Sequence, residues 1–343
     1  MNRTMMSQTP QPQAAAQQAL PANVFGICFG LAGLAQMWTT VHDLGETALW
    51  PGAALWLVTA AIWLGTVLAY VSRLAARHAW RAEVAHPVQS PFVSLAAIVA
   101  MLLGVAVADY ERPFGEGVFV AGLILTVAFG SWITAQWITN DMRLAQWHPG
   151  YMLPTVTDGL LAAASSARLG HRTLAYVMFG YGVLCWVLLG SILMLRLATQ
   201  PALPAVLLPT LAIEVAPPVV AGNAWLTLNG GTIDALAAGL AGHAGFMVLV
   251  QFALIPLYRR APFGPGYWAF AFSYTSAVTL GIRWLIVEHV SGRHALTWLL
   301  VAPVTAAMAL LAARTVLALK NGTFLPQVPD IRPADNGTGL KQG

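Results

Sequence analysis

Charged side chains are scarce in this sequence. Asp, Glu, Lys and Arg make up 9% of its 343 residues, whereas a typical soluble domain carries about 25%. Hydrophobic residues make up 58%, so the chain cannot cover itself with a solvated surface. A soluble globular protein is therefore excluded, and a lipid bilayer is the expected solvent.

The residues of common catalytic and metal sites are also rare or unsuitably spaced. The two cysteines, Cys28 and Cys185, lie in apolar stretches and lack the spacing of metal ligands. No histidine pair has the i, i+4 spacing of a zinc site, and no glycine-rich phosphate loop or Ser-His-Asp arrangement stands out. We therefore expect no enzyme, no metal and no cofactor. The formal net charge of +4 comes largely from basic residues at the ends of apolar stretches, which indicates membrane topology rather than nucleic-acid binding.

The two ends of the chain differ from the rest. Residues 1–20 are rich in Gln, Ala and Pro and contain no apolar core, so they form neither a signal peptide nor a spanning segment. Residues 326–343 are rich in Pro, Asp, Asn and Gly. We predict that both ends are disordered cytoplasmic tails around a transmembrane domain at residues 21–325.

Ten apolar segments fill the region between the tails, each near the roughly 20 residues that a spanning helix needs. Joins such as 110–114 and 229–231 are too short to hold a domain, so the segments form a series of helical hairpins. The predicted spans are 22–41, 52–72, 91–109, 115–138, 151–169, 172–196, 205–228, 232–257, 265–287 and 295–319.

Arg and Lys are unevenly divided between the two sides of this array. Cytoplasmic loops of membrane proteins carry an excess of basic residues. With the N-terminus inside, twelve basic residues fall on the cytoplasmic side and four on the outer side, namely Arg112, Arg168, Arg172 and Arg293. We predict a multi-pass protein of a bacterial inner membrane with both termini in the cytoplasm.

Pro and Gly recur within the odd-numbered spans. A proline in a helix interior kinks the helix and frees a backbone carbonyl, which in lipid needs a partner from protein or water. We therefore expect the odd-numbered helices around a central path. Close helix packing by small residues is the alternative explanation. The candidates for pore lining or kinks are Gly26, Gly30, Gly104, Pro154, Pro217 and Pro218.

Three charged residues, Asp158, Glu214 and Arg283, fall within odd-numbered spans. A charge at the bilayer centre costs at least roughly 2.5–3.5 kcal/mol on insertion scales, so such residues normally face a wet cavity or a partner. Glu214 could face the interior beside a helix break at Pro217 and Pro218, or it could reach the cytoplasmic interface. Arg283 lies near the outer end of its span and could simply reach water. All three are candidate sites of intramembrane charge or proton binding.

Five motifs follow one another along nearly the whole chain. They are FGICFGLAGLAQMW at 25–38, EVAHPVQSPFVSL at 83–95, HPGYMLPTV at 148–156, APPVVAGNAWLTLNGG at 216–231 and GYWAFAFSYTSA at 266–277. Through them the sequence resembles the TehA family of tellurite-resistance and C4-dicarboxylate transport proteins, which is similar in turn to the slow anion channel of plant guard cells. The resemblance implies an all-α fold of five helical hairpins in a quasi-fivefold arrangement around a central pore, with odd-numbered helices inside and even-numbered helices outside. It also implies a homotrimer in which each protomer has its own pore for small anions.

The resemblance further implies a gate. In the family a phenylalanine of the ninth helix closes the pore, within a Trp-Ala-aromatic-X-Phe pattern that runs here from Trp268 to Phe272. Phe272 is the matching residue. Phe270 is a second pore-lining candidate, but residues two apart on a helix point about 200° from each other, so the two cannot both face the axis.

The carboxyl groups of Asp158 and Glu214 leave the transport mechanism open, because an anion pore should not carry free carboxylates. They could point between helices, be protonated, or be neutralised in one case by Arg283. The favoured hypothesis is an anion channel or channel-like transporter gated by Phe272. The alternatives are a proton-coupled carrier of C4-dicarboxylates such as malate or succinate, and a tellurite-resistance protein with no flux of its own.

Overall fold

The computed structural model describes residues 20–77, 83 and 86–325. Every regular element within these residues is a helix, as predicted for an all-α membrane protein. Apart from Leu20, the predicted tails lie outside the described residues. The α-helices are α1 (Phe25–Asp43), α2 (Trp50–Arg77), α4 (Ser94–Ala108), α5 (Arg112–Thr139), α6 (Asp158–Arg168), α7 (Arg172–Thr199), α8 (Ala216–Leu228), α9 (Ala235–Tyr258), α10 (Ala269–Val287) and α11 (Arg293–Lys320).

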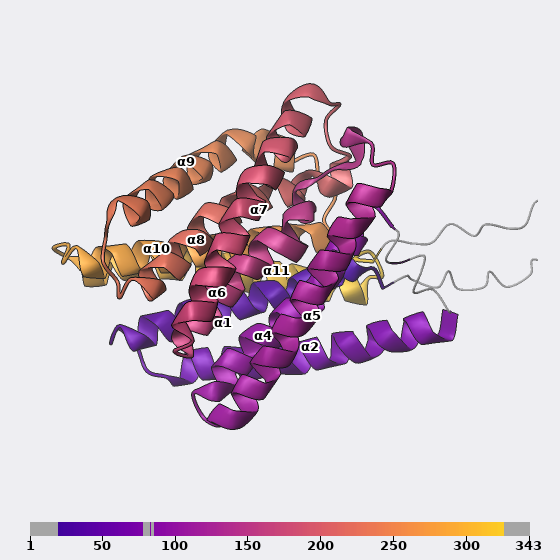
Figure 1. Ribbon diagram of the computed structural model, residues 1–343. Helices are drawn as coiled ribbons and strands as arrows, with labels where there is room; N and C mark the ends of the chain where they lie inside the picture. Colours follow the sequence, from indigo (N-terminus) through magenta and orange to yellow (C-terminus); the bar gives the residue numbers. More distant parts are fainter. Residues whose placement is uncertain (1–19, 78–82, 84–85, 326–343) are drawn as a thin grey trace, which may run out of the picture.

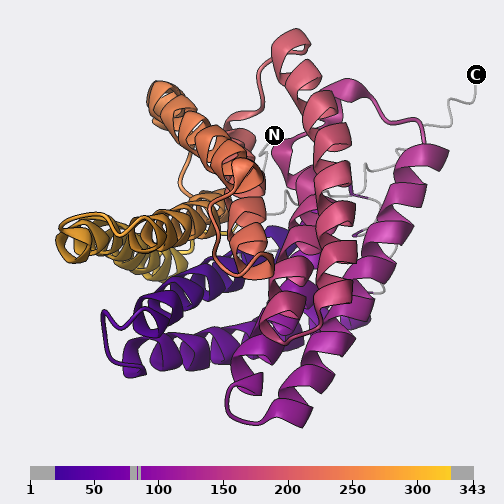
Figure 2. The same ribbon diagram turned by 60° about the vertical axis from the view of Figure 1, so that its left-hand side comes forward.

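Consecutive helices pair into hairpins that follow one another around the molecule (Figure 1; Figure 2). The pairs are α1 with α2, α4 with α5, α6 with α7, α8 with α9 and α10 with α11. The first members of the pairs also touch each other, because α1 contacts α4 and α10, α6 contacts α4 and α8, and α8 contacts α10. These five inner helices therefore close a ring around one axis.

The inner and outer helices differ strongly in burial. The buried share of an 18-residue apolar stretch within each span measures this difference. It is 78% in Ala22–Asp43 and 83% in Ala205–Leu228, both of which contain inner helices. It is 11% in Trp50–Ala76 and 17% in Arg293–Lys320, which are outer helices. The inner helices α1, α4, α6, α8 and α10 correspond to the odd-numbered predicted spans, so the expected division into odd spans inside and even spans outside is confirmed.

Each inner helix begins after a short helical segment that is not α and that contains or follows a proline. Proline has no backbone N–H and so interrupts α-helical hydrogen bonding. Because all inner helices run in the same direction, these interruptions gather at one end of the molecule. They are η1 (Ala22–Val24) after Pro21, η2 (Ser90–Val93) with Pro91, η4 (Pro149–Met152) and the π-turn η5 (Leu153–Thr157) with Pro154, η6 (Ala205–Val215) with Pro209, and η7 (Pro265–Trp268).

The predicted fifth span, 151–169, forms no long apolar helix. Among the described residues, 9 helical segments are long and apolar enough to cross a membrane, and this segment is not one of them. It consists of the end of η4, η5 and the 11-residue α6, which starts at Asp158. Since α6 is packed among α4, α5, α7 and α8, it needs no apolar surface toward lipid.

Two glycines singled out in the sequence serve close helix packing. A Cβ atom at Gly30 of α1 would lie 2.5 Å from the Cβ atom of Ala271 in α10. A Cβ atom at Gly104 of α4 would lie 2.4 Å from the backbone nitrogen of Phe119 in α5. Small residues of this kind let membrane helices approach each other. For Gly30 and Gly104, the packing explanation therefore fits better than pore lining.

Candidate functional site

One face of α10 carries a stripe of residues that point toward the axis. Phe272, Ser276, Thr279 and Arg283 are spaced by four, three and four residues. At about 100° per residue this spacing keeps all four within about 60° of each other around the helix.

Two cavities lie along this stripe on either side of Phe272. The first, here called the wide cavity, has a volume of about 270 Å³ and is lined from α1, α6, α8 and α10, including Ser276, Thr279 and Arg283. The second, the narrow cavity, has a volume of about 30 Å³ and is lined from all five inner helices or the turns that precede them, including Phe272. A cavity needs at least about 10–15 Å³ on this measure to hold one water molecule, so the narrow cavity has room for about two. The cavities thus form an axial path that is interrupted at Phe272.

The interruption consists of two aromatic rings. Phe272 is only 2% exposed, and its ring stacks on that of Phe29 in α1 with centroids 3.8 Å apart and planes at 12°. Phe29 also lines the narrow cavity. Sequence reasoning singled out Phe272 but missed Phe29, although Phe29 stands next to Gly30 on the helix that approaches α10 most closely.

Phe270 faces away from this path. Its ring packs edge-on against Tyr258 of α9 with centroids 4.8 Å apart, and it lines neither axial cavity. The opposite directions of Phe270 and Phe272 follow from their separation by two residues. The structure therefore places Phe272 on the axis and Phe270 beside an outer helix.

The other glycine and proline candidates have different positions. Gly26 lines the narrow cavity. Pro154 lies in the π-turn η5. Pro217 and Pro218 lie in the first turn of α8, where proline is tolerated, so they do not break the helix. The interruption of this segment lies before them, in the 11 residues of η6.

Asp158 points between helices rather than at the axis. Its side chain is fully buried at the start of α6, and neither carboxylate oxygen has a hydrogen-bond partner among the described residues. Its polar neighbours are Thr126 of α5 and Tyr181 of α7, which belong to the outer helices.

Glu214 also lies off the axial path. It belongs to η6, and it lines a separate cavity of about 310 Å³ that is formed by η6 with α7, α9 and the residues that follow α7. Its Oε1 atom is buried without a hydrogen-bond partner in the described structure. Of the interpretations left open for the two carboxylates, a position between helices is the one that the geometry favours.

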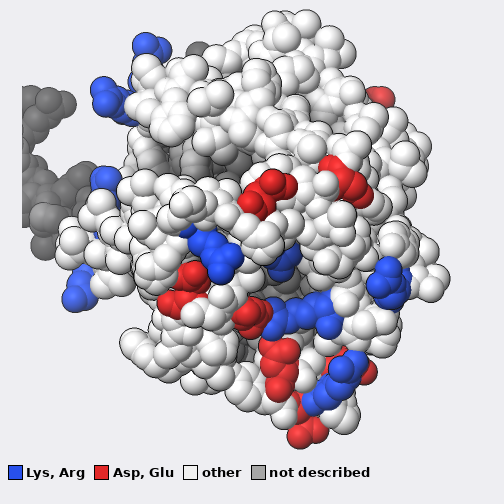
Figure 3. All heavy atoms as spheres, turned by 90° about the vertical axis from the view of Figure 1, so that its left-hand side faces the viewer, with Lys and Arg blue, Asp and Glu red and all other residues white. Residues whose placement is uncertain are grey.

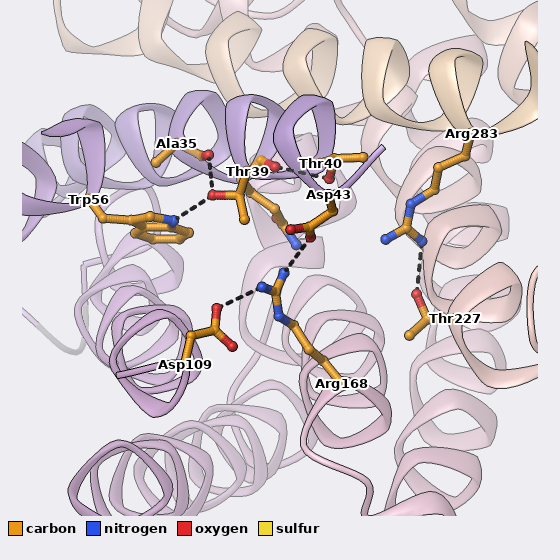
Figure 4. A network of polar contacts seen from close by, with 10 residues as sticks. Ala35, Thr39, Thr40, Asp43, Trp56, Asp109, Arg168, Thr227 and Arg283 are labelled. Atoms are coloured by element: carbon orange, nitrogen blue, oxygen red, sulfur yellow. Dashed lines mark hydrogen bonds and ion pairs between the residues drawn. The ribbon is translucent and has the colours of Figure 1, made fainter. Parts of the chain in front are cut away.

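Arg283 lies in the wide cavity and does not neutralise either carboxylate, so that part of the hypothesis was wrong. Its Nη1 atom donates to the hydroxyl of Thr227 at 2.8 Å (Figure 4) and to the carbonyl oxygen of Asn223 at 3.1 Å. The guanidinium forms no ion pair with a described carboxylate. Both partners belong to α8. The physical reason is direction: the α10 stripe turns Arg283 toward the axis, whereas Asp158 and Glu214 face the outer helices.

Arg168, which sequence reasoning used only for topology, lines the wide cavity as well. Its guanidinium donates to Asp109 at 2.7 Å and lies 3.6 Å from Asp43 (Figure 4). Acidic and basic side chains gather around a hollow on this face of the molecule (Figure 3). The path is therefore polar and charged at the end of the wide cavity.

At the opposite end, His148 lies outside the long spans and is fully buried. Its ring stacks on Phe92 with centroids 5.9 Å apart, and its Nδ1 atom accepts a hydrogen bond from the backbone N–H of Gly150 at 3.2 Å. Burial, with a smaller contribution from the charge of Arg196, lowers the pKa of His148 from 6.5 to about 4. This histidine is neutral at physiological pH.

The ring of inner helices and its interrupted axial path define a multi-pass membrane protein of the channel or transporter class. The family model described as voltage-dependent anion channel matches residues 19–316. The chain belongs to this family.

Individual relatives agree with this assignment. The tellurite resistance protein TehA homolog of Haemophilus influenzae is 30% identical over 261 residues, which cover 75% of this chain and 79% of that protein. The S-type anion channel SLAH3 of Arabidopsis thaliana is 25% identical over 279 residues, 78% of this chain and 43% of that protein. The guard cell S-type anion channel SLAC1 of the same plant is 25% identical over 278 residues, 77% of this chain and 49% of that protein. The matched region is thus about half the length of these plant relatives.

Proposed function

We propose that this protein conducts small anions along the axis of its inner helices, as a channel or channel-like transporter, and that Phe272 is its gate. The observation that carries the proposal is the position of Phe272, stacked on Phe29 between the wide and narrow cavities. Two further facts support it: the guanidinium of Arg283 lines the path, and two of the plant relatives are named as anion channels.

Removal of the gating ring tests this proposal. Phe272→Ala should raise chloride and nitrate flux in proteoliposomes, because it opens the closed stretch between the cavities. The matched control is Phe270→Ala, which removes the same group from the same helix but on the face that packs against α9. If folded Phe272→Ala conducts no faster than wild type and the control, Phe272 is not the gate.

The geometry supports a channel over a proton-coupled carrier. A carrier of dicarboxylates would need a titrating group on the path, whereas Asp158 and Glu214 lie beside outer helices. Flux of chloride, nitrate and malate, each measured with and without a pH gradient, separates the two mechanisms. A channel gives flux that follows voltage, and malate uptake driven by the pH gradient would contradict it.

We also propose that the protein is a homotrimer in a bacterial inner membrane, with cytoplasmic tails at residues 1–20 and 326–343 and a transmembrane domain at 21–325. Large apolar side chains on the outer helices support contact with lipid or with other protomers: Leu57 is 73% exposed, Leu184 67% and Leu249 66%. Native mass spectrometry of the purified protein would test the trimer. Reporter fusions at both termini would test their location.

A further inference from the structure

The wide cavity contains two guanidinium groups in different electrostatic surroundings (Figure 4). Arg168 is shared by two carboxylates, those of Asp109 and Asp43, at 2.7 and 3.6 Å. Arg283 forms no ion pair with a carboxylate within the part of the chain that the structure describes, and its two hydrogen-bond partners are neutral oxygens. Arg283 therefore has no ion-pair partner among the described residues, whereas Arg168 has two.

Arg283 is held in place but still has donors available. Its contacts with Asn223 and Thr227 occupy Nη1 alone. The Nη2 and Nε atoms make no hydrogen bond with a described residue, and neither is sealed within the protein interior. A guanidinium has five N–H donors in a fixed fork. Those on Nη2 and Nε have no hydrogen-bond partner among the described residues, and Arg283 lines the cavity.

Neutral donors of two helices line the same cavity. The Gln36 amide of α1 and the Ser276 hydroxyl of α10 both border it, and neither donates a hydrogen bond to another described residue. Charge-assisted hydrogen bonds to anions are the strong ones, and neutral donors add to them. In a volume of about 270 Å³ an anion can keep part of its hydration while it contacts these groups.

We propose that the wide cavity is a binding site for a small inorganic anion, such as chloride or nitrate, centred on the guanidinium of Arg283. The proposal rests on the anion path proposed above and assigns it a binding residue. Arg283 lies three turns from Phe272 on the same face of α10, about 16 Å along the helix. An anion bound there waits in line with the gate, and the negative charge of Asp43 at the cavity wall limits how tightly it binds.

Chloride binding can be measured without any flux, from the broadening of the ³⁵Cl NMR line by purified full-length protein in detergent. We expect saturable broadening for wild type, and a dissociation constant raised at least about tenfold in Arg283→Gln, because a hydrogen bond to a charged group is typically worth a factor of ten or more. Arg283→Lys should keep most of the binding. Asp43→Asn should tighten it severalfold, which tests the site in the opposite direction. The matched control is Arg293→Gln, an exposed arginine at the start of α11.

The outcomes separate this site from the proposed function. Equal chloride affinity in wild type, Arg283→Gln and Asp43→Asn, all with unchanged melting temperatures, would overturn the site even if Phe272→Ala conducts. Binding that depends on Arg283 while Phe272→Ala stays closed would retain the site and remove the gate. If Arg283→Gln does not fold, a failure of Asp43→Asn to tighten binding decides against the site.

Discussion

Replacement of Phe29 by leucine should raise anion flux, because it removes the stacking partner of Phe272, the proposed gate, and keeps most of the apolar bulk. Phe29 and Phe272 stack with centroids 3.8 Å apart, and such aromatic pairs contribute about 0.5–1.5 kcal/mol beyond the area that they bury. If the gate opens by parting the two rings, loss of this contribution shifts the closed–open equilibrium by the same amount. At 1.4 kcal/mol per factor of ten, the open population should rise roughly two- to twelvefold.

The assay is chloride efflux from proteoliposomes with matched protein content. Phe25→Leu is the control, since Phe25 is a buried phenylalanine one turn earlier on α1 whose ring packs edge-on against Tyr70 of α2 at 5.2 Å. Phe29→Leu and Phe272→Ala both remove the same ring contact. The free-energy effect of the double substitution on the closed–open equilibrium should therefore be no larger than the sum of the two single effects. Equal flux in Phe29→Leu, Phe25→Leu and wild type would refute the reasoning that the stacked pair holds the gate closed.

Three other substitutions test the surroundings of the path. Gly33→Ala should lower the melting temperature, because the new Cβ atom would lie 2.5 Å from the Thr275 hydroxyl. Overpacking of this kind costs about 1–3 kcal/mol. The control Gly65→Ala should not lower the melting temperature, because the space around Gly65 is open. Lowering the pH from 7 to 5 should destabilise the protein by about 2 kcal/mol through His148. The pKa of His148 is about 4 in the folded state and 6.5 in the unfolded state, so the unfolded state takes up the proton first. His148→Asn should remove this part of the pH dependence of the melting temperature. Asp158→Asn should leave chloride flux and its pH profile unchanged, because the side chain lies off the path. It should raise the melting temperature, because it replaces a buried carboxylate that has no hydrogen-bond partner among the described residues. If the substitution abolishes a pH dependence of flux, the proton-coupled carrier becomes the better hypothesis.

The number of helices was predictable from hydropathy, but their inner or outer position was not. The inner segment Ser90–Ala108 has a mean hydropathy of 2.4 and is 61% buried, whereas the outer segment Trp50–Ala76 has 1.9 and is 11% buried. Lipid and a packed protein interior are both apolar, so the same composition suits either place. The distribution of proline and glycine, together with the family resemblance, indicated the inner helices. The fifth segment was predicted as a span but forms no long apolar helix, because complete enclosure lets it carry Asp158 and a π-turn.

The charged residues show a second limit of the sequence. Position along a predicted span identified Asp158, Glu214 and Arg283. That position does not determine which side of the helix faces the axis, because this depends on which helices pack against it in the fold. Arg168 was counted only for topology because it ends its span. The sequence did contain a signal for Arg168. Asp43 and Asp109 lie at the ends of α1 and α4, on the same side of the membrane as Arg168 at the end of α6. They therefore approach Arg168 when these inner helices gather around one axis.

The close contact of α1 and α10 restricts how the gate can open. A Cβ atom at Gly33 would lie 2.9 Å from the Phe272 ring and 3.2 Å from its Cα atom, so the two helices already touch beside the ring, and parting them would break the whole interface. Rotation of the side chain about χ1 leaves that interface intact, and helices offer few rotamers for it. The narrow cavity, at about 30 Å³, has no room for a benzyl ring, whereas the wide cavity has about 270 Å³. If Phe272 is the gate, as proposed, its ring should therefore swing toward the near end of the wide cavity at Ser276, about two turns short of Arg283.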